Sequence, residues 1–503
     1  MSAEAAASSA SQKNQSNEIS GFPELSLSEE IVMQTVMQQI KEKYASFGYI
    51  PYESRLVEHL ETLTEKGIDG KEVFVLNMLH KGEVREKSET EQIHALRFDL
   101  TVPFSRFVGQ NYKTLPFPLK RYQVQKVYRG ETARESLGRF CEFYQSDIDV
   151  IGKDSLDLAY DSEFPCVIYK IFREVIGIER FVIRINNRKL LEGLFQEYGM
   201  NDPTKLRKAV KIIDNMEKVP IEDTTAALVA LDLSVEHAAN IQRFFDVSRT
   251  CRPENVIKAY RQLNIKSPVF RQGLDELSNV IQGIIANGVP PQYFMVDPSI
   301  ARGLDYYTGT VYETTLLDHR HLGSVCSGGR FDDLVGTLSG DKNLKFPGCG
   351  ISIGLSRLIP ALIRAGVLRA NTMTMAPVLI AVQDSKYMDA YNAMAKILRS
   401  AGIGTAVNYN GGRLKQQIEY AAKCGFKILL IGREELEQGN VQVKLMNSGT
   451  ENTVVHFTNL VQYVGDLLKT TDSGFKTQPV PNDRQFSEKT EAEILAELQA
   501  SLV

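Results

Sequence analysis

The sequence predicts a mixed α/β protein of the α+β kind, with an antiparallel sheet in its first part and a separate α/β domain near its end. Three observations lead to this prediction. Residues 72–150 hold strand-like runs joined by short turns, residues 188–290 show helical periodicity with few strand signals, and strands alternate with helices after residue 376. Short turns favour antiparallel neighbours, whereas strands that alternate with helices favour a partly parallel sheet.

A chain of 503 residues is too long for one ordinary domain, and its 43% hydrophobic and 24% charged residues are typical of a globular protein. Residues 1–20 are small and polar and lack the features of a signal peptide, so we expect a disordered leader on a cytoplasmic protein. No apolar run is long enough to span a membrane, so no membrane partner is expected.

The cysteines and the net charge narrow the class of protein further. The six cysteines are far apart and form no CxxC pair, so neither a zinc site nor a disulfide framework is predicted. The net charge of −4 gives no overall basic surface, and nucleic acid would therefore need a local patch. An exposed helical face is the simpler interpretation of the one candidate patch. Its members are Arg180, Arg184, Arg188, Lys189, Lys205, Arg207, Lys208 and Lys211.

The first expected element is an amphipathic helix at residues 28–47. Ser28 can cap its start, and Gly48 suits the position after its end. Apolar residues recur every four positions and should face the core. They are Val32, Val36, Ile40 and Tyr44. A strand-like stretch at 49–56 and a short helix to about Thr64 should follow.

The rest of the first part should alternate between strands and single helices. A helix should begin near Thr101, with Pro103 early enough to be tolerated, and another should occupy 155–176, where Pro165 should kink or break it. A helix should also start at Leu355. Strands are expected at 73–79, 96–100, 120–129, 139–151, 181–186, from 293, at 308–317 and at 346–354.

The second domain should begin near Ala376 with the order βαβαββα. We expect its strands at 377–382, 404–409, 427–432 and 441–446, and its helices at 386–400, 413–424 and 457–469. This order predicts an independent α/β domain with a partly parallel sheet.

Residues 301–313, which read ARGLDYYTGTVYE, hold the most informative cluster of polar groups. Arg302 offers a permanently charged fork for a carboxylate or a phosphate. Tyr306 and Tyr307 offer flat apolar faces with a hydroxyl at the rim, and Gly303 and Gly309 let the backbone approach a ligand. A strand corner with a solvated arginine is the simpler interpretation of the stretch on its own.

The strand at 139–150 places a cation and several acceptors on one face. Side chains alternate along a strand, so Arg139 shares its side with Gln145, Asp147 and Asp149. A ligand with a triphosphate at one end and an amine or imidazole at the other would match this polarity.

Several segments resemble the histidyl-tRNA synthetases, a family of class II aminoacyl-tRNA synthetases. VYRGETARESLGRFCEFYQSDIDVIG (127–152) is similar to motif 2 in its histidyl form, and GCGISIGLSRL (348–358) to motif 3. ARGLDYYTG (301–309) resembles the histidine-binding signature, and SGGRFDDLVG (327–336) the second histidine-specific segment. ALRFDLTVPFSRFV (95–108) resembles the segment that supplies the amino-acid pocket.

The resemblance implies a class II catalytic domain with an antiparallel sheet at 21–187 and 291–370, interrupted by a helical insertion at 188–290. It further implies an anticodon-binding-like domain at 376–470 and a tail at 471–503. Members of the family act as histidine–tRNA ligases in protein biosynthesis. The implied partners are L-histidine, ATP with Mg²⁺ and tRNA(His), and a homodimer is implied because such catalytic domains pair through motif 1.

The resemblance also implies a role for each matching residue. For ATP, Arg129 would bind the α-phosphate, Glu131 the adenine edge and Arg139 the γ-phosphate, with Arg357 clamping the nucleotide from the other side. For histidine, Asp99, Thr101 and Gln145 would take the amino group, Asp149 and Tyr307 the imidazole, and Tyr306 would line the pocket. Arg302 would touch the histidine carboxylate and the α-phosphate. No dedicated protein ligand for a metal and no zinc are implied.

The implied reaction needs clustered cations, because a carboxylate attacks a phosphate and both are anions. A carboxylate is already a nucleophile near neutral pH, so no general base is required. Cys141, Ser356 and Arg55 depart from the usual family pattern.

Three alternatives stand beside this interpretation. The first is a non-catalytic regulatory paralogue of the synthetase, such as the regulatory subunit of ATP phosphoribosyltransferase, which characteristically lacks the C-terminal domain. The second is a module that only binds RNA or dimerises. The third is another class II synthetase with a similar C-terminal domain, which the RGLDYYTG segment disfavours.

Overall fold

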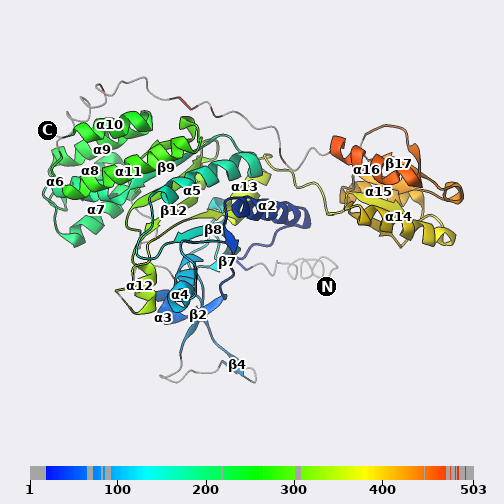
Figure 1. Cartoon of the computed structure of the whole chain (residues 1–503), viewed down its shortest axis with the longest axis horizontal. Coiled ribbons are helices and arrows are strands. Elements are labelled where there is room, and N and C mark those ends of the chain that lie inside the picture. The colour runs from blue at the N-terminus through cyan, green and yellow to red at the C-terminus, as the bar shows by residue number, and fades with distance from the viewer. Residues whose placement is uncertain are drawn as a thin grey trace, which may run out of the picture. The chain divides into compact units, whose positions relative to one another are not determined.

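The computed structural model describes residues 19–64, 72–80, 83–84, 92–216, 219–263, 265–300, 307–341, 343–446, 448–471, 476, 482, 484–485 and 493. The chain divides into two compact units (Figure 1). The first comprises Met1–Pro23, Met37–Leu358 and Pro479–Val503, and the second comprises Glu24–Val36 and Ile359–Gln478. Of the helices within these described ranges, none is long and apolar enough to cross a membrane.

An eight-stranded sheet with the order β1-β7-β8-β13-β12-β11-β9-β10 forms the centre of the first unit. Only the outer pairs β1–β7 and β9–β10 are parallel, which confirms the predicted antiparallel sheet. The strands are β1 (Ile50–Pro51), β7 (Leu119–Tyr128), β8 (Glu142–Ile151), β9 (Phe181–Asn187), β10 (Phe294–Val296), β11 (Thr310–Leu316), β12 (Ser324–Phe331) and β13 (Gly348–Gly354). The strand expected at 49–56 is much shorter, because Pro51 has no N–H to continue the ladder. Strand β12 was not expected from the sequence.

The sheet has two faces, and we call the one that carries Gln123, Gln145, Asp147, Asp149 and Ser352 the polar face. Register places these side chains together, since Asp147 lies opposite both Gln123 and Ser352. The other face is the back face.

The end of α2 (Leu27–Ser46) and helix α5 (Ala159–Lys170) contact the back face. Tyr44 near the end of α2 lies 2.9 Å from Ser146 Oγ through its hydroxyl. The predicted helix at 28–47 is confirmed, and so is its buried face of Val32, Val36, Ile40 and Tyr44.

Helices α4 (Thr101–Asn111) and α12 (Leu334–Ser339) pack together beside the polar face. Phe98, Phe104 and Val335 belong to the hydrophobic cluster that they share. This packing fixes the start of α4, where Asp99 and Thr101 lie. A small sheet and helix α3 (Leu60–Thr64) complete the region, with β2 (Val57–His59), β6 (His94–Leu96) and β3 (Val75–Leu76), next to the pair β4 (Leu79–His80) and β5 (Glu83–Val84).

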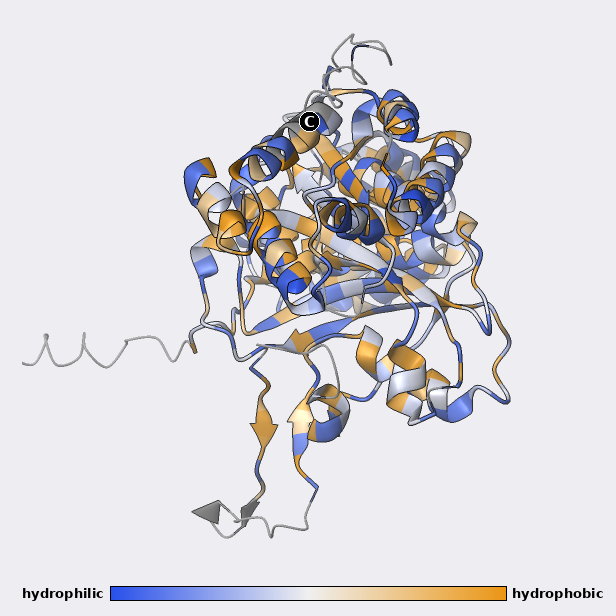
Figure 2. Cartoon of the chain, turned by 90° about the vertical axis from the view of Figure 1, so that its left-hand side faces the viewer, coloured by the Kyte–Doolittle hydropathy of each residue, from blue (hydrophilic) through white to orange (hydrophobic). Residues whose placement is uncertain are grey.

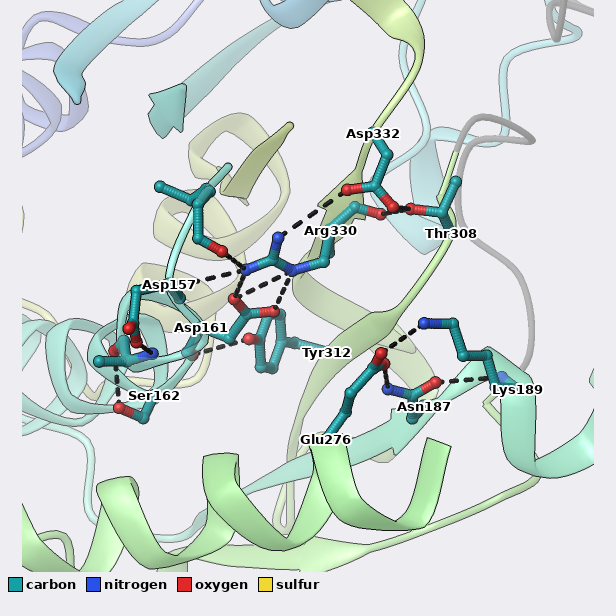
Figure 3. Close-up of polar contacts among 12 residues, drawn as sticks. Asp157, Asp161, Ser162, Asn187, Lys189, Glu276, Thr308, Tyr312, Arg330 and Asp332 are labelled. Atoms are coloured by element: carbon teal, nitrogen blue, oxygen red, sulfur yellow. Dashed lines mark hydrogen bonds and ion pairs between the residues drawn. The ribbon is translucent and has the colours of Figure 1, made fainter. Parts of the chain in front are cut away.

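Helix α5 runs through Pro165 and ends five residues later, where a π-helical turn at Ile171–Ile176 continues the chain. Proline has no N–H, so the carbonyl of Asp161 loses its helical donor. The hydroxyl of Tyr312 on β11 donates to that carbonyl at 2.7 Å (Figure 3). Pro165 therefore does not end the helix, because a side chain from the sheet replaces the missing hydrogen bond.

In the described parts of the chain between β9 and β10 lie six helices, which we call the helical insertion (Figure 1). Most begin after a residue whose side chain caps the first turn: Asn187, Asp202, Ser234 and Ser267 each accept a backbone N–H there. The helices are α6 (Arg188–Glu197), α7 (Pro203–Asn215), α8 (Ile221–Val229), α9 (Val235–Thr250), α10 (Pro253–Gln262) and α11 (Pro268–Ala286). Hydrophobic and hydrophilic residues mix along the same helices in Figure 2, as expected for elements that bury one side.

The second unit contains a five-stranded sheet of order β15-β14-β16-β17-β18. β14 is parallel to β15 and β16, which confirms the predicted partly parallel sheet. Strand β18 was not expected. The strands are β14 (Val378–Ala381), β15 (Thr405–Asn408), β16 (Ile428–Ile431), β17 (Asn440–Leu445) and β18 (Thr453–His456), and the helices are α14 (Met388–Ser400), α15 (Leu414–Cys424) and α16 (Phe457–Thr471). Helix α13 (Leu355–Arg364) follows β13 as predicted.

The bond between Tyr312 and Asp161 yields a prediction about stability. We expect Tyr312→Phe to lower the free energy of unfolding by about 1–2 kcal/mol, since it leaves a buried carbonyl without its donor. In a Pro165→Ala background the helix regains that donor, so the same substitution should cost clearly less. Urea denaturation of the four proteins measures both costs, and equal costs in the two backgrounds would contradict this interpretation.

Candidate active site

A buried ion pair joins strands β7 and β8 on the polar face. Arg121 and Asp149 lie opposite each other in register, form an ion pair, and are 1% and 2% exposed. Arg121 Nη2 also donates to the carbonyl of Leu100 at 3.0 Å, and its guanidinium lies 4.8 Å from the ring centre of Phe104. Thr101 Oγ1 donates to Asp149 Oδ1 at 3.5 Å. The pair thereby connects the sheet to the first turn of α4.

Further along β8, the polar face holds buried hydrogen-bond acceptors at Asp147, at its partner Gln123, and at Gln145 two residues away. Gln145 Nε2 donates to Ser352 Oγ at 2.9 Å, and Gln123 Nε2 donates to Ser54 Oγ at 3.0 Å. Among the described residues, no hydrogen-bond partner occurs for Gln145 Oε1, Asp147 Oδ1 or Gln123 Oε1. A buried acceptor without a donor is costly, so these oxygens suit a ligand that brings donors.

Burial shifts the acidity of this cluster. It raises the pKa of Asp147 to about 7 and that of Asp149 to about 6, while the Arg121 guanidinium opposes both rises. Burial also raises the pKa of Tyr307 well above its usual value, and nearby Asp149, Asp147 and Asp99 add to that rise. At pH 7 this end of the site therefore offers a largely ionised Asp149, an Asp147 that is about half ionised, and a neutral phenol at Tyr307.

Three arginines gather at the other end of β8. Arg357 Nη1 donates to the carbonyl of Ser324 at 2.9 Å, and Arg129 Nε donates to the carbonyl of Phe98 at 3.1 Å. Burial lowers the pKa of Arg357, and the charges of Arg139 and Arg129 lower it further, with Glu131 opposing. Like charges this close repel one another, so an anionic ligand would stabilise them.

Tyr307 is fixed from several sides. Arg188 Nη1 donates to its carbonyl at 2.8 Å, and Thr308 N donates to the carbonyl of Arg330 at 2.8 Å. Arg330 itself is anchored to Asp161 of α5, as Figure 3 shows. Asp161 is fully buried, so this ion pair ties β12 to the back-face helix.

The structure brings together most of the residues selected from the sequence. Asp99, Thr101, Asp149 and Tyr307 share the acidic end, and Gln145 lies two positions beyond Asp147 on the same face of β8. Arg129, Glu131, Arg139 and Arg357 form the cationic end. Arg302 and Tyr306 lie outside the described residues, and their roles stay predictions.

Arg121, Gln123 and Ser352 of the polar face were not among the residues selected from the sequence. Arg121 and Gln123 share one side of the strand predicted at 120–129, so the alternation used for 139–150 could have identified them. Nothing in the sequence indicated Ser352, which reaches the pocket only through the pairing of β8 with β13.

The candidate nucleic-acid patch is largely engaged in ion pairs. Four of its members bind carboxylates, and Arg188 holds the carbonyl of Tyr307. The pairs are Arg180–Asp318, Arg184–Asp297, Lys189–Glu276 and Lys205–Asp232. These contacts argue against one continuous binding surface made from all eight residues.

The three departures from the family pattern occupy defined positions. Ser356 Oγ accepts the backbone N–H of Tyr144 at 2.8 Å, and Arg55 Nη2 lies 2.7 Å from the buried Glu58. The Cys141 thiol donates to the carbonyl of Glu131 at 3.4 Å, and burial raises its pKa. Each residue therefore has a structural contact of its own.

Comparison with known proteins identifies two matching family models. The model described as histidyl-tRNA synthetase matches residues 21–358, and the one described as anticodon binding domain matches residues 377–467.

Similar proteins carry the same description. A protein named histidine–tRNA ligase from Nostoc sp. is 38% identical over 442 residues, which is 86% of this chain and 94% of that protein. Another of that name from Stenotrophomonas maltophilia is 39% identical over 84% of this chain and 92% of that protein. The crystal structure of histidyl-tRNA synthetase from Nostoc sp. superposes with a TM-score of 0.80 at 37% identity, covering 90% of this chain and 99% of that one.

A more distant structure shares the fold. It is described as an ATP phosphoribosyltransferase regulatory subunit/histidyl-tRNA synthetase from Bacillus halodurans, and it superposes with a TM-score of 0.64 at 18% identity. It covers 81% of this chain and 96% of its own.

The backbone beside the ion pair leaves no room for a side chain at Gly350. A Cβ there would overlap Asp149 Oδ1 and the carbonyl of Ile148. We expect Gly350→Ala to displace the carboxylate and to lower the free energy of unfolding by about 1–3 kcal/mol. Gly354→Ala on the same strand is the matched control, since its nearest atom would be 3.9 Å away. Equal unfolding free energies for the two variants would contradict this geometry.

Proposed function

This chain belongs to the histidyl-tRNA synthetase family, and we propose that its polar face is the site where histidine is activated with ATP and then transferred to tRNA. The enzyme is an aminoacyl-tRNA synthetase. The first step forms histidyl-adenylate and releases diphosphate, and the second esterifies the 3′ end of tRNA(His). The observation that carries the proposal is the opposition on one sheet face of a cluster of arginines and a cluster of buried acceptors.

The cationic end binds ATP in this proposal. Arg129 binds the α-phosphate, Arg139 holds the γ-phosphate, and Arg357 clamps the nucleotide from the other side. Arg129 is oriented by the carbonyl of Phe98 and by the ring of Phe143, 5.0 Å away, so it is held in place before ATP binds. Preorganised cations stabilise charge that accumulates in the transition state. Glu131 accepts from the adenine edge.

The acidic end binds histidine. Asp99, Thr101 and Gln145 receive the amino group, and Asp149 and Tyr307 receive the imidazole, with Tyr306 beside them. Arg121 keeps Asp149 oriented and largely ionised near neutral pH. An amino acid without a donor at that position would leave buried acceptors unpaired, which discriminates strongly against it.

The chemical step needs positioning more than proton transfer. The histidine carboxylate attacks the α-phosphorus as an anion, and Arg302 neutralises both groups in this proposal. Magnesium would supply charge neutralisation at the phosphates when bound. No group of three or more His, Cys, Asp or Glu side chains in the described ranges could hold a metal ion, so ATP itself would provide most of its ligands.

The proposal also covers tRNA binding, dimerisation and location in the cell. The second unit, which carries the anticodon-binding match, contacts tRNA, and two copies of the chain form a dimer in the cytoplasm. The regulatory alternative has less support. The relatives at 38–39% identity are named ligases, and the structure whose title includes a regulatory subunit is only 18% identical.

Histidine-dependent ATP–pyrophosphate exchange tests the function directly. We expect exchange with histidine and none above background with the other amino acids, because the acidic end requires the imidazole donors. Charging of tRNA(His) should follow in the same preparation. A folded protein that binds histidine without exchange would instead support the regulatory alternative.

The pH dependence of histidine binding follows from the raised pKa values. Asp149 and Asp147 are neutral below about pH 6 and 7 and carboxylates above. Ionisation makes Asp149 a stronger acceptor for the imidazole N–H, and it gives the acidic end a negative charge that favours the cationic amino group bound by Asp99, Thr101 and Gln145. The KM for histidine in the exchange assay should therefore fall by roughly tenfold between about pH 5.5 and 7.5. Asp147→Asn should remove the part of this change near pH 7. An identical profile in that variant would exclude Asp147 as a contributor.

A further inference from the structure

Two arginines from different parts of the first unit converge on Asp297, one residue beyond β10. Arg184 Nε of β9 donates to Asp297 Oδ2 at 2.6 Å, and Arg249 Nε of α9 donates to both carboxylate oxygens at 3.0 Å. Asp297 is 1% exposed. Ser299 donates to the same carboxylate through its hydroxyl at 2.6 Å and accepts from Arg249 Nη2. We call these four residues the Asp297 cluster.

Strand β9 adds further contacts to the segment 297–300. Asn186 Nδ2 donates to the carbonyls of Pro298 at 3.1 Å and Ile300 at 3.0 Å. Asp297 N donates to the carbonyl of Ile185 at 2.9 Å, and Arg184 Nη2 donates to Ser299 Oγ at 3.1 Å. Four successive residues are therefore tied to strand β9 immediately before residue 301.

The backbone beyond residue 306 is held in the same way. Arg188, the first residue of α6, donates through Nη1 to the carbonyl of Tyr307 and through its backbone N–H to the carbonyl of Gly309 at 3.0 Å. Arg188 and Arg249 both belong to the helical insertion. The insertion thus contacts the chain on both sides of residues 301–306, and one of these contacts is at Tyr307 of the acidic end.

Arg484, from the C-terminal part of the chain, also contacts α9 and β10. Arg484 Nη2 donates to the carbonyl of Arg249 at 3.2 Å, and its Nη1 donates to the carbonyl of Phe294 on β10 at 2.8 Å. The end of α9 is therefore attached to the edge strand from a second direction.

The two arginines keep the Asp297 carboxylate ionised. Burial would raise the pKa of Asp297, but Arg184 and Arg249 outweigh it and hold the pKa below its ordinary value. With two arginines on one carboxylate, loss of Arg249 leaves Asp297 paired with Arg184. Substitution of Arg249 therefore removes the contact made by the insertion without leaving Asp297 as a buried charge that has no partner.

We propose that Arg249 is a positioning residue through which the helical insertion holds the backbone at 297–300 and thereby sets the histidine end of the site. The proposal rests on the proposed function. Arg249 touches neither substrate in it. Its effect reaches the acidic end through Asp297 and Ser299, which Arg184 bonds to β9, and through Arg188 directly after β9, which donates to the carbonyl of Tyr307. Histidine binding should therefore depend on Arg249, while ATP binding should not.

Three variants test the proposal. Arg249→Met removes the fork, Arg249→Lys keeps the charge with a single donor group, and Arg261→Met is the control. Arg261 lies in α10 of the same insertion, is half exposed, and contacts Ser278 at 3.0 Å and Asp275 at 3.4 Å. In pyrophosphate exchange we expect Arg249→Met to raise the KM for histidine by about tenfold and to change that for ATP by less than about twofold. Arg249→Lys should recover part of the loss, and Arg261→Met should match the wild type.

Hydrogen–deuterium exchange of the full-length protein tests the contact without relying on activity. Amides in residues 297–300 should exchange faster in Arg249→Met than in Arg261→Met. An unchanged KM for histidine in a folded Arg249→Met protein, or an equal rise in both KM values, would overturn the proposal. If the wild type shows no histidine-dependent exchange at all, the proposed function fails. Faster amide exchange at 297–300 would then still support the positioning contact, and unchanged amide exchange would overturn it.

Discussion

The buried ion pair of Arg121 and Asp149 is the interaction on which the rest of the site depends. Taking two charges out of water costs several kcal/mol per ion unless each finds good partners. Here the partners come from three segments: strand β7, strand β8 and the first turn of α4, whose Leu100 carbonyl and Thr101 hydroxyl complete the contacts. The pair therefore couples the geometry of the acidic end to the packing of α4 against the sheet.

The same face shows why the site needs its ligands. On this face Asp147 Oδ1, Gln123 Oε1 and Gln145 Oε1 have no hydrogen-bond partner among the described residues, and the other end holds three arginines that repel one another. Unpaired buried acceptors and clustered like charges are both unfavourable without a ligand. The donors of a zwitterionic amino acid would pair with the acceptors, and a triphosphate would neutralise the arginines. Binding energy is thereby concentrated where two anions must meet, which is the principal barrier to adenylate formation. The helical insertion adds a second constraint through Arg188 and Arg249, outside the cluster of reacting groups.

Local patterns in the sequence were sufficient for much of this arrangement. Spacing of four predicted the buried face of α2, and alternation along 139–150 placed Gln145, Asp147 and Asp149 on one side of a strand. Contacts between distant segments were not predictable in this way. Arg330 and Asp161 lie 169 residues apart, and the tolerance of α5 for Pro165 depends on a hydroxyl 151 residues away. Glycine-rich β12 reads as a turn, yet Gly328 and Gly329 are strand residues because neighbouring backbone fills the space of a side chain. The roles of Arg302 and Tyr306 remain as the resemblance implied them.

Calorimetric titration of Asp149→Asn with histidine and, separately, with ATP tests the central claim most directly, because it measures the two ends of the site independently. Asparagine keeps the shape of the side chain and removes the charge that Arg121 orients. We expect the Kd for histidine to rise by at least about tenfold, corresponding to about 1.4 kcal/mol, and the Kd for ATP to stay within about twofold. Equal losses for both ligands, or an unchanged Kd for histidine, would contradict the assignment of the acidic end to histidine.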